Sequence, residues 1–368
     1  LRRRIVEVAL PLARPAIAAG VSLAVMETLA DYGVGSYFGL TTFSTGIYKA
    51  WLVMFDRIAA AQLASLLLLL VALLLWVERR AEARLRFAGS RSTASQSAEA
   101  RPIALHGRAA WLAQLACALP VLLGFVLPVA VLLRLAWREA RYGEFGLPLA
   151  RFAKWSWTSF ELAALAALLA VLLATALGFA RRLRTRRTGH RPDALALGTQ
   201  LVGLGYAVPG AVIAVGILLP LGWVQAHWPN SGAGALVTGT VFGLLYAYLV
   251  RFSAVALQSV ESGYARLPAS IDDSARMLGA GRWRVLAELH APLLRRSVLA
   301  AGLLVFVDVM KELPATLVLR PFDSDTLAVV AYNLARDERL AEAALPSLAI
   351  VAVGLIPVVM LSRALRSK

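Results

Sequence analysis

Residues 57–80 read RIAAAQLASLLLLLVALLLWVERR, and this stretch decides the class of the fold. It carries no charge from residue 58 to residue 77, and about 20 apolar residues are what a helix needs to cross the hydrocarbon core of a bilayer. Trp76 and the pair Arg79 and Arg80 close the stretch, as interfacial aromatics and cytosolic basic residues do in membrane helices. It therefore predicts a membrane-spanning helix whose carboxyl end lies in the cytosol.

The whole chain has the composition of a membrane protein. Hydrophobic residues make up 59% of its 368 residues and charged residues only 16%, against about 25% charged in soluble domains. Disorder is excluded by this composition, and a disulfide-rich scaffold is excluded by the single cysteine, Cys117. The sequence predicts an all-α membrane protein with about eight transmembrane helices, at residues 14–31, 58–77, 111–137, 156–180, 195–224, 236–254, 297–313 and 344–362.

The formal net charge of +16 has two possible meanings, a basic groove for nucleic acid or a cytosolic membrane face. With the amino terminus placed in the cytosol, 27 basic and 9 acidic residues fall inside, and 11 basic and 13 acidic residues fall outside. This division follows the positive-inside rule. The six arginines between residues 181 and 191 are therefore interpreted as a topology anchor, and a nucleic-acid partner is not expected.

The chain repeats itself at a spacing of 281 residues. Pro11 falls on Pro292, and residues 1–86 as a whole align with residues 282–368. Parallel repeats of this kind build the two halves of some transporters around a pathway near the membrane midplane. We therefore expect a first half represented by its last two helices, a flexible cytosolic linker, and a complete second half of six helices, at residues 1–86, 87–110 and 111–368. On this division about four helices would precede Leu1, and the chain is expected to be truncated at its amino terminus.

The longest cytosolic segment with a helical pattern spans residues 255–297. Ser270 lies just before two acidic residues, which suits the start of a short helix. Gly279 and Gly281 are expected to break that helix, and a second apolar face beginning at Trp283 is expected to end at Pro292. Such a helix–turn–helix can stand out from the membrane and dock into a partner.

This segment resembles the EAA loop of ATP-binding-cassette (ABC) importer permeases. The family pattern is Glu-Ala-Ala, three residues, Gly, nine residues, Ile, one residue and Leu-Pro. In this chain Asp273 replaces the Glu and Ser274 replaces the first Ala, while Leu289 replaces the Ile and Ala291 replaces the Leu. Residues 8–11, Val-Ala-Leu-Pro, match the tail of the same motif in the first repeat. Residues 29–87 and 305–363, together with YAVPG at 206–210, are similar to the two halves of fused permeases of the ferric-iron type.

The resemblance implies a type I ABC importer transmembrane fold, with the transmembrane domain at about 156–362. It implies a permease of the bacterial inner membrane for iron(III), embedded in the lipid bilayer, powered by a cytosolic ABC ATPase dimer and supplied by a periplasmic substrate-binding protein. The residues implied to couple to the ATPase are Asp273, Ser274, Ala275, Gly279, Leu289, Pro292 and Pro11. Because many importers share this loop, thiamine or another small solute remains an alternative cargo. An ion-driven secondary transporter and a non-transport scaffold remain open as other classes.

Catalytic motifs are absent from the sequence. None of the four lysines follows a glycine-rich phosphate loop, so ATP is expected to be hydrolysed by a partner subunit rather than by this chain. The four histidines lack the spacing of a metal site, and no GxSxG motif occurs. His290, inside the EAA-like segment, is expected to pack rather than to bind a metal. The sequence therefore predicts a transport subunit without a cofactor or metal of its own.

Four carboxylates recur at matching positions of the two repeats. Glu27 and Asp31 are spaced to share one helix face, and Asp308 and Glu312 repeat that spacing. Ionisable groups inside membranes usually face the bundle interior or a water-filled path, so these four form a possible pathway for a cation such as ferric iron. The alternative is charge pairing within the bundle, with Lys311 neutralising Glu312.

Overall fold

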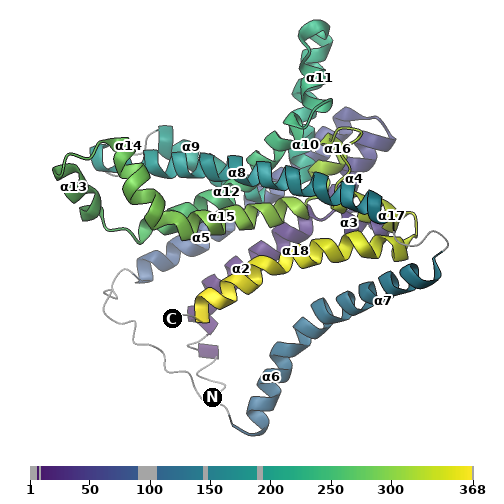
Figure 1. Ribbon diagram of the computed structural model, residues 1–368, viewed down its shortest axis with the longest axis horizontal. Helices are drawn as coiled ribbons and strands as arrows, with labels where there is room; N and C mark the ends of the chain where they lie inside the picture. The colour runs from purple at the N-terminus through teal and green to yellow at the C-terminus, as the bar shows by residue number, and fades with distance from the viewer. Residues whose placement is uncertain (1–5, 8–9, 90–105, 144–147, 189–193, 367–368) are drawn as a thin grey trace.

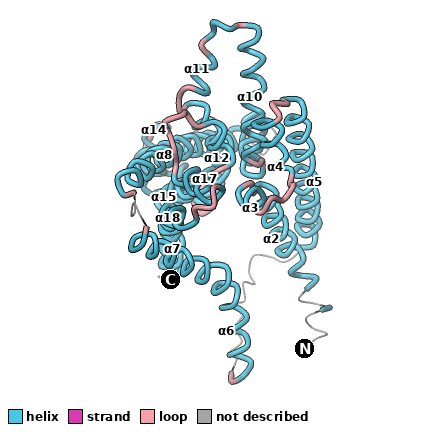
Figure 2. Tube along the Cα trace, turned by 90° about the vertical axis from the view of Figure 1, so that its right-hand side faces the viewer, coloured by secondary structure: helices cyan, strands magenta, loops and turns pink. Residues whose placement is uncertain are grey.

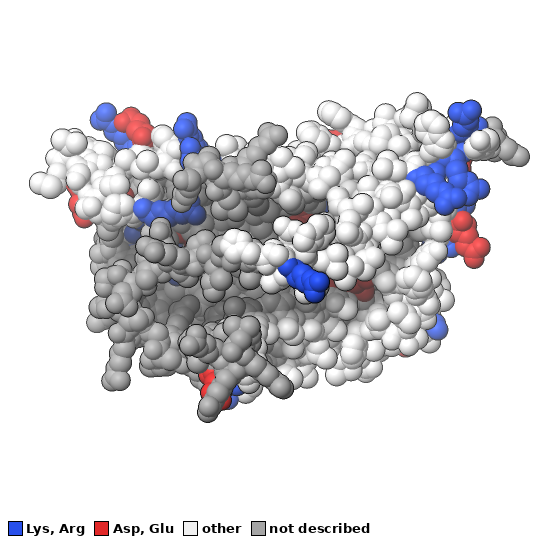
Figure 3. Space-filling model, turned by 90° about the horizontal axis from the view of Figure 1, so that it is seen from below, with Lys and Arg blue, Asp and Glu red and all other residues white. Residues whose placement is uncertain are grey.

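The computed structural model describes residues 6–7, 10–89, 106–143, 148–188 and 194–366, and all regular elements in these ranges are helical (Figure 1). Within these described ranges, six helical segments are long and apolar enough to cross a membrane: 57–77, 108–142, 149–184, 210–227, 242–265 and 340–360. They confirm an all-α membrane protein. Seen from below, the charged side chains of the described residues gather mainly toward the two ends of the molecule (Figure 3).

The two remaining predicted spans correspond to α2 (Leu10–Ala30) and α15 (Ala291–Met310), which are 21 and 20 residues long. Both are continuous helices at the predicted places. α15 contains Arg295, Arg296 and Asp308, which make it less apolar than the six segments above.

The predicted span 195–224 is wrong as a single helix. α9 (Ala194–Leu204) ends in a 3-10 turn, η4 (Gly205–Ala207), and α10 (Gly210–His227) begins after Pro209. Val208 has an extended backbone with φ −79° and ψ 122°, as steric contact with a following proline favours. Pro209 itself has no N–H to continue the hydrogen bonding of α9. The break places Gly205 directly against α12 (Phe242–Ala265), where an added Cβ would lie 1.9 Å from the carbonyl oxygen of Val250.

The main core lies between three long helices, α8 (Leu149–Thr188), α12 and α15, which run side by side (Figure 1). Small side chains fill much of the contact, among them the fully buried Ala163, Ala170, Ala256 and Ala301. Small residues let membrane helices approach closely, and the resulting van der Waals packing drives their association.

The same order of helices occurs at both ends of the chain. α2 is followed by the short α3 (Gly33–Tyr37) and α4 (Phe43–Tyr48), a π-helical turn η2 (Lys49–Val53) and the long α5 (Arg57–Gly89). α15 is followed by the short α16 (Pro314–Leu319) and α17 (Leu327–Arg336) and the long α18 (Leu340–Arg366). Figure 2 shows α2 to α5 grouped on one side of the molecule, and α8, α15 and α18 on the other.

A long arm lies outside the bundle. It consists of α6 (Arg108–Val121), the π-helical turn η3 (Leu122–Val126) and α7 (Leu127–Tyr142). α7 packs along α18, whereas α6 extends away and buries no side chain (Figure 1). Most of the predicted linker, residues 87–110, lies outside the described residues.

A short hairpin and the segment predicted to be cytosolic complete the structure. The 3-10 turn η5 (Pro229–Ser231) joins α10 to α11 (Ala233–Thr238). At the other end of the long bundle helices, α13 (Ala269–Met277), α14 (Arg282–Arg284) and the π-helical η6 (Val285–His290) lead from α12 into α15 (Figure 1).

Candidate functional site

The four carboxylates that the repeat singles out line one cavity of about 510 Å³. Glu27 lies in the last turn of α2 and Asp31 directly follows that helix. Asp308 lies in the last turn of α15 and Glu312 follows two residues after its end. The cavity is also lined by Tyr206 of η4, Arg251 of α12 and Lys311, together with uncharged residues of both repeats. The tertiary structure thus brings both repeats to a single space.

Glu312 has a structural role at the wall of this cavity. Its carboxylate is buried, accepts a bond from Arg251 Nη1 at 3.1 Å, and accepts the backbone N–H groups of Ala315 and Thr316 at 2.9 and 3.0 Å. The Thr316 hydroxyl also donates to it. The first N–H groups of a helix have no partner within the helix, and Glu312 accepts two of them at the amino terminus of α16. The expected pairing of Glu312 with Lys311 is therefore wrong, and Arg251 takes that place.

The other three carboxylates differ in their partners. Asp308 pairs with Lys311 at 3.0 Å. Asp31 accepts the N–H of Val34 at 3.4 Å, so it stands at the start of α3 as Glu312 stands at the start of α16. Glu27 accepts a hydrogen bond from the Tyr206 hydroxyl at 2.8 Å.

The charges around the cavity do not balance. Within the described ranges, no basic side chain lies within ion-pair distance of Glu27 or Asp31. Four carboxylates thus face two basic side chains, and clefts lined by an excess of one charge concentrate ions of the opposite charge. Among the described residues, no three His, Cys, Asp or Glu side chains are arranged to hold a metal ion. The excess of carboxylates can attract a cation.

The outer loops of the two repeats meet directly beside this cavity. The Tyr32 and Tyr332 hydroxyls are 3.0 Å apart, and Ser36 Oγ lies 2.9 Å from the Tyr332 hydroxyl. The Tyr48 hydroxyl donates to the carbonyl oxygen of Pro314. Since Tyr32 and Pro314 also line the cavity, this contact forms part of the cavity wall.

The EAA-like segment forms a projecting tip at the opposite end of the bundle. α13 begins after Pro268 rather than at Ser270 and ends before Gly279, which has φ +81°. A backbone with this φ favours glycine, so the predicted break is confirmed. Beyond the break the chain turns into α14, and the tip carries the most exposed apolar side chains of the segment, Met277, Leu278 and Trp283, at 89%, 86% and 80%.

Pro292 does not end the second helix as expected. α14, η6 and α15 follow one another without interruption, and Pro292 lies in the first turn of α15. A proline removes an N–H donor and its ring collides with the preceding turn of a regular α-helix. The wider π-helical turn η6 precedes it and accommodates this defect. Pro11 occupies the same position in the first turn of α2.

The residues implied to couple to an ATPase are spread along this segment. Asp273 and Ser274 are exposed on α13, and Ala275 is half-buried. Gly279 lies in the turn, Leu289 is half-buried in η6, and Pro292 is exposed in α15. Pro11 belongs to the other repeat, so the structure does not bring it into the same tip.

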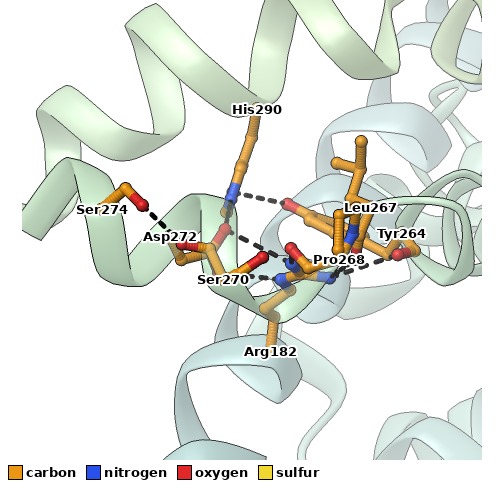
Figure 4. A network of polar contacts seen from close by, with 8 residues as sticks. All are labelled: Arg182, Tyr264, Leu267, Pro268, Ser270, Asp272, Ser274 and His290. Carbon is orange, nitrogen blue, oxygen red and sulfur yellow. Dashed lines mark hydrogen bonds and ion pairs between the residues drawn. The ribbon is translucent and has the colours of Figure 1, made fainter.

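A buried ionic network beneath this tip was missed by the sequence analysis (Figure 4). Arg182 of α8 donates to both carboxylate oxygens of Asp272, at 2.9 and 3.3 Å, and His290 Nε2 lies 3.0 Å from Asp272 Oδ1. Burial opposes ionisation of Asp272, but the hydrogen bonds from Arg182 and His290 outweigh it and lower the pKa of this carboxyl below its usual 3.8. Arg182 was interpreted only as part of the topology anchor, because its partner lies 90 residues away.

His290 packs as expected, with its ring edge-on to Phe179 and Tyr264. Both ring nitrogens of His290 also lie within hydrogen-bond distance of polar side chains. Because ionised Asp272 can only accept, His290 Nε2 carries the proton in this contact. Nδ1 lies 3.4 Å from the Tyr264 hydroxyl, which can donate to it.

Two known transport proteins are similar to this chain in sequence, although no protein-family model matches it. The Fe(3+)-transport system permease protein FbpB 2 of Haemophilus influenzae is 26% identical over 360 residues, which are 96% of this chain and 66% of that protein. The putative 2-aminoethylphosphonate transport system permease protein PhnV of Salmonella typhimurium is 30% identical over 157 residues, 43% of this chain and 56% of that protein. The chain thus spans only part of the length of both relatives.

A solved structure shares the fold. It is a bacterial alginate ABC transporter in complex with a periplasmic protein that holds an alginate pentasaccharide. The match has a TM-score of 0.52 and 13% sequence identity, and it covers 68% of this chain and 92% of that one. The helical architecture and the permease relatives lead to one conclusion: this chain is a multi-pass inner-membrane protein with the fold of an ABC-transporter permease, and its sequence is similar to those of known transport permeases.

Proposed function

We propose that this chain forms the membrane pathway of an ATP-driven importer whose cargo is ferric iron. The observation that carries the proposal is the cavity between the two repeats, where Glu27 and Asp31 leave an excess of negative charge. A cation is the cargo that such a cavity favours. The 26% identity to an Fe(3+)-transport permease supports the same cargo.

The proposal assigns ATP hydrolysis to a separate cytosolic ABC ATPase dimer and delivery to a periplasmic binding protein, with no cofactor held by this chain. The exposed Met277, Leu278 and Trp283 at the tip of the EAA-like segment support an ATPase contact, because large apolar side chains that are almost fully exposed mark protein interaction sites. Arg276, Arg282 and Arg284 lie near them in the sequence and support a cytosolic position of this tip.

The first prediction concerns dependence on that partner. Purified chain in proteoliposomes is expected to show no uptake of radiolabelled ferric ion under an ion gradient. Uptake is expected to appear when the ABC ATPase and the loaded binding protein of the same gene cluster are added with ATP. Uptake by the chain alone, driven by a proton or sodium gradient, would identify a secondary transporter and reject the proposal.

The second prediction concerns the cavity. The double variant Glu27→Gln and Asp31→Asn removes two negative charges but keeps oxygen acceptors for Tyr206 and for the start of α3. We expect the initial rate of ferric ion uptake to fall roughly tenfold, because the local attraction of the cation is lost. Basal ATP hydrolysis by the complex is expected to stay unchanged.

The matched control for this variant is Asp323→Asn, which removes a carboxylate from the exposed loop between α16 and α17, away from the cavity lining. It should leave uptake within about twofold of the unaltered protein. Equal rates for the cavity variant and the control would remove the pathway role from Glu27 and Asp31.

A second candidate cargo is a small zwitterion such as 2-aminoethylphosphonate, which the relative PhnV suggests. The cavity contains the basic Arg251 and Lys311 for a phosphonate. However, Arg251 is already engaged by Glu312 and Lys311 by Asp308. Uptake assays with each compound separate the two cargoes, and thiamine can be tested in the same assay.

A further inference from the structure

The helix that bears the EAA-like motif is attached to the protein by a charge rather than by an apolar face. Among the described side chains of α13, Asp272 is the buried one, with 2% of its surface exposed. Ile271 and Ala275 are half-buried, and Met277 points into solvent. An apolar contact tolerates sliding, whereas a hydrogen-bonded charge pair fixes direction as well as distance. The orientation of α13 therefore depends on what holds Asp272.

Arg182 holds Asp272 with a fully used guanidinium group. Besides its two bonds to the carboxylate, Arg182 donates to three backbone carbonyl oxygens. Nη1 donates to those of Tyr264 and Leu267, at 3.2 and 3.0 Å, and Nη2 donates to that of Pro268, at 3.1 Å. Arginine has five N–H donors in a fixed planar geometry, and all five are satisfied here. One side chain from α8 thus joins the carboxyl end of α12 to α13.

His290 completes the network from the opposite side. It is buried, lies at the junction of η6 and α15, and contacts the same carboxylate as Arg182 (Figure 4). Asp272 is therefore held between α8 and α15. Arg182 also binds the backbone carbonyl of Tyr264, which connects α12 to the same network. These are the three helices that form the main core.

We infer that Arg182, Asp272 and His290 form a positioning clamp that makes α13 move as one body with α8, α12 and α15. The inference rests on the proposed coupling of this segment to an ATPase. Two of the clamped helices also line the cavity, α12 through Arg251 near its middle and α15 through Asp308 near its carboxyl end. A displacement of the tip is thereby passed to the cavity wall instead of being absorbed by a loose α13.

The test is the number of ferric ions transported per ATP hydrolysed, measured in proteoliposomes with the ATPase and the loaded binding protein. Arg182→Lys keeps the charge but cannot make five directed bonds, and Asp272→Asn keeps the shape but removes the charge. Both are expected to lower the ratio about tenfold while ATP hydrolysis continues. The neighbouring Arg181, which pairs with Glu261 at the surface, provides the control Arg181→Met, whose ratio should stay within about twofold.

A second measurement is independent of transport and of the proposed function. A spin label is attached at Met277→Cys in a Cys117→Ser background, and its mobility reports how firmly α13 is held. Asp272→Asn and Arg182→Lys are expected to raise that mobility, and Arg181→Met is not. If the unaltered protein shows no ATP-dependent uptake, the proposed function fails. The mobility of the spin label still tests whether Arg182 and Asp272 hold α13 in place.

Three results would overturn the clamp. The first is an unchanged transport-to-ATP ratio in both clamp variants. The second is an unchanged label mobility in both. The third is failure of both variants to assemble, which would assign the network to folding rather than to coupling.

Discussion

Replacing Glu312 by alanine is expected to destabilise the folded protein by about 3–5 kcal/mol, the range found when one partner of a buried ion pair is removed. The substitution leaves Arg251, whose side chain is 12% exposed, without its counter-charge. It also strands the N–H groups of Ala315 and Thr316 at the start of α16. The loss is measured as the denaturation midpoint in detergent, followed by tryptophan fluorescence.

The matched control for this substitution is Asp308→Ala in the same helix region. Its partner Lys311 is 54% exposed, so solvent screens the lost pair and the expected cost is below about 1 kcal/mol. Adding Arg251→Met to Glu312→Ala should recover part of the stability, because the stranded charge is removed. If Glu312→Ala costs no more than Asp308→Ala, the structural role of Glu312 is wrong.

The second large effect is expected at Gly205, in the turn that breaks the predicted fifth span. An alanine Cβ would lie 1.9 Å from the carbonyl oxygen of Val250 and 3.0 Å from its carbonyl carbon. These are backbone atoms, so no rotamer change relieves the contact and η4 must move away from α12. We expect Gly205→Ala to cost about 3 kcal/mol, at the upper end of overpacking effects, and to reduce uptake, because Arg251 follows Val250 at the cavity.

Gly203→Ala is the control for this change, two residues earlier in α9. A Cβ there meets no atom within 4 Å. Alanine is a better helix former than glycine by about 0.8–1 kcal/mol, so this variant should be slightly more stable than the unaltered protein. Both variants are compared by denaturation midpoint and by uptake. Equal midpoints would show that the close approach of η4 to α12 is not required.

Much of the fold could be predicted because membrane helices have a strong local signal. The apolar run at 57–80 lies in α5. The repeat spacing of 281 residues agrees with the structure, in which α2 and α15 begin at residues 10 and 291. The break at 205–209 was missed, since the stretch reads as one continuous apolar run. The signal for it was present: a proline forces an extended conformation on the residue before it, here Val208.

The candidate site was predictable in its position but not in its partners. The spacing of Glu27 with Asp31 and of Asp308 with Glu312 predicted that each pair shares one helix face. In the structure Asp31 and Glu312 lie just beyond the ends of α2 and α15, and all four carboxylates line one cavity. The choice between pathway and pairing could not be made from spacing, because Arg251 lies 61 residues before Glu312. The neighbouring Lys311 was the nearer candidate in sequence, and it turned out to bind Asp308.

The sequence by itself determined the membrane class, most of the helical spans and the two repeats, and it predicted an orientation, because apolar length and the position of basic residues are local properties that act against a uniform bilayer. Only the tertiary structure decided which charges around the cavity neutralise each other and which do not. It also decided that Arg182, Asp272 and His290 meet beneath the EAA-like segment. Such contacts depend on directed bonds between helices far apart in the chain, and these bonds form only when packing brings the donors and acceptors within about 3 Å.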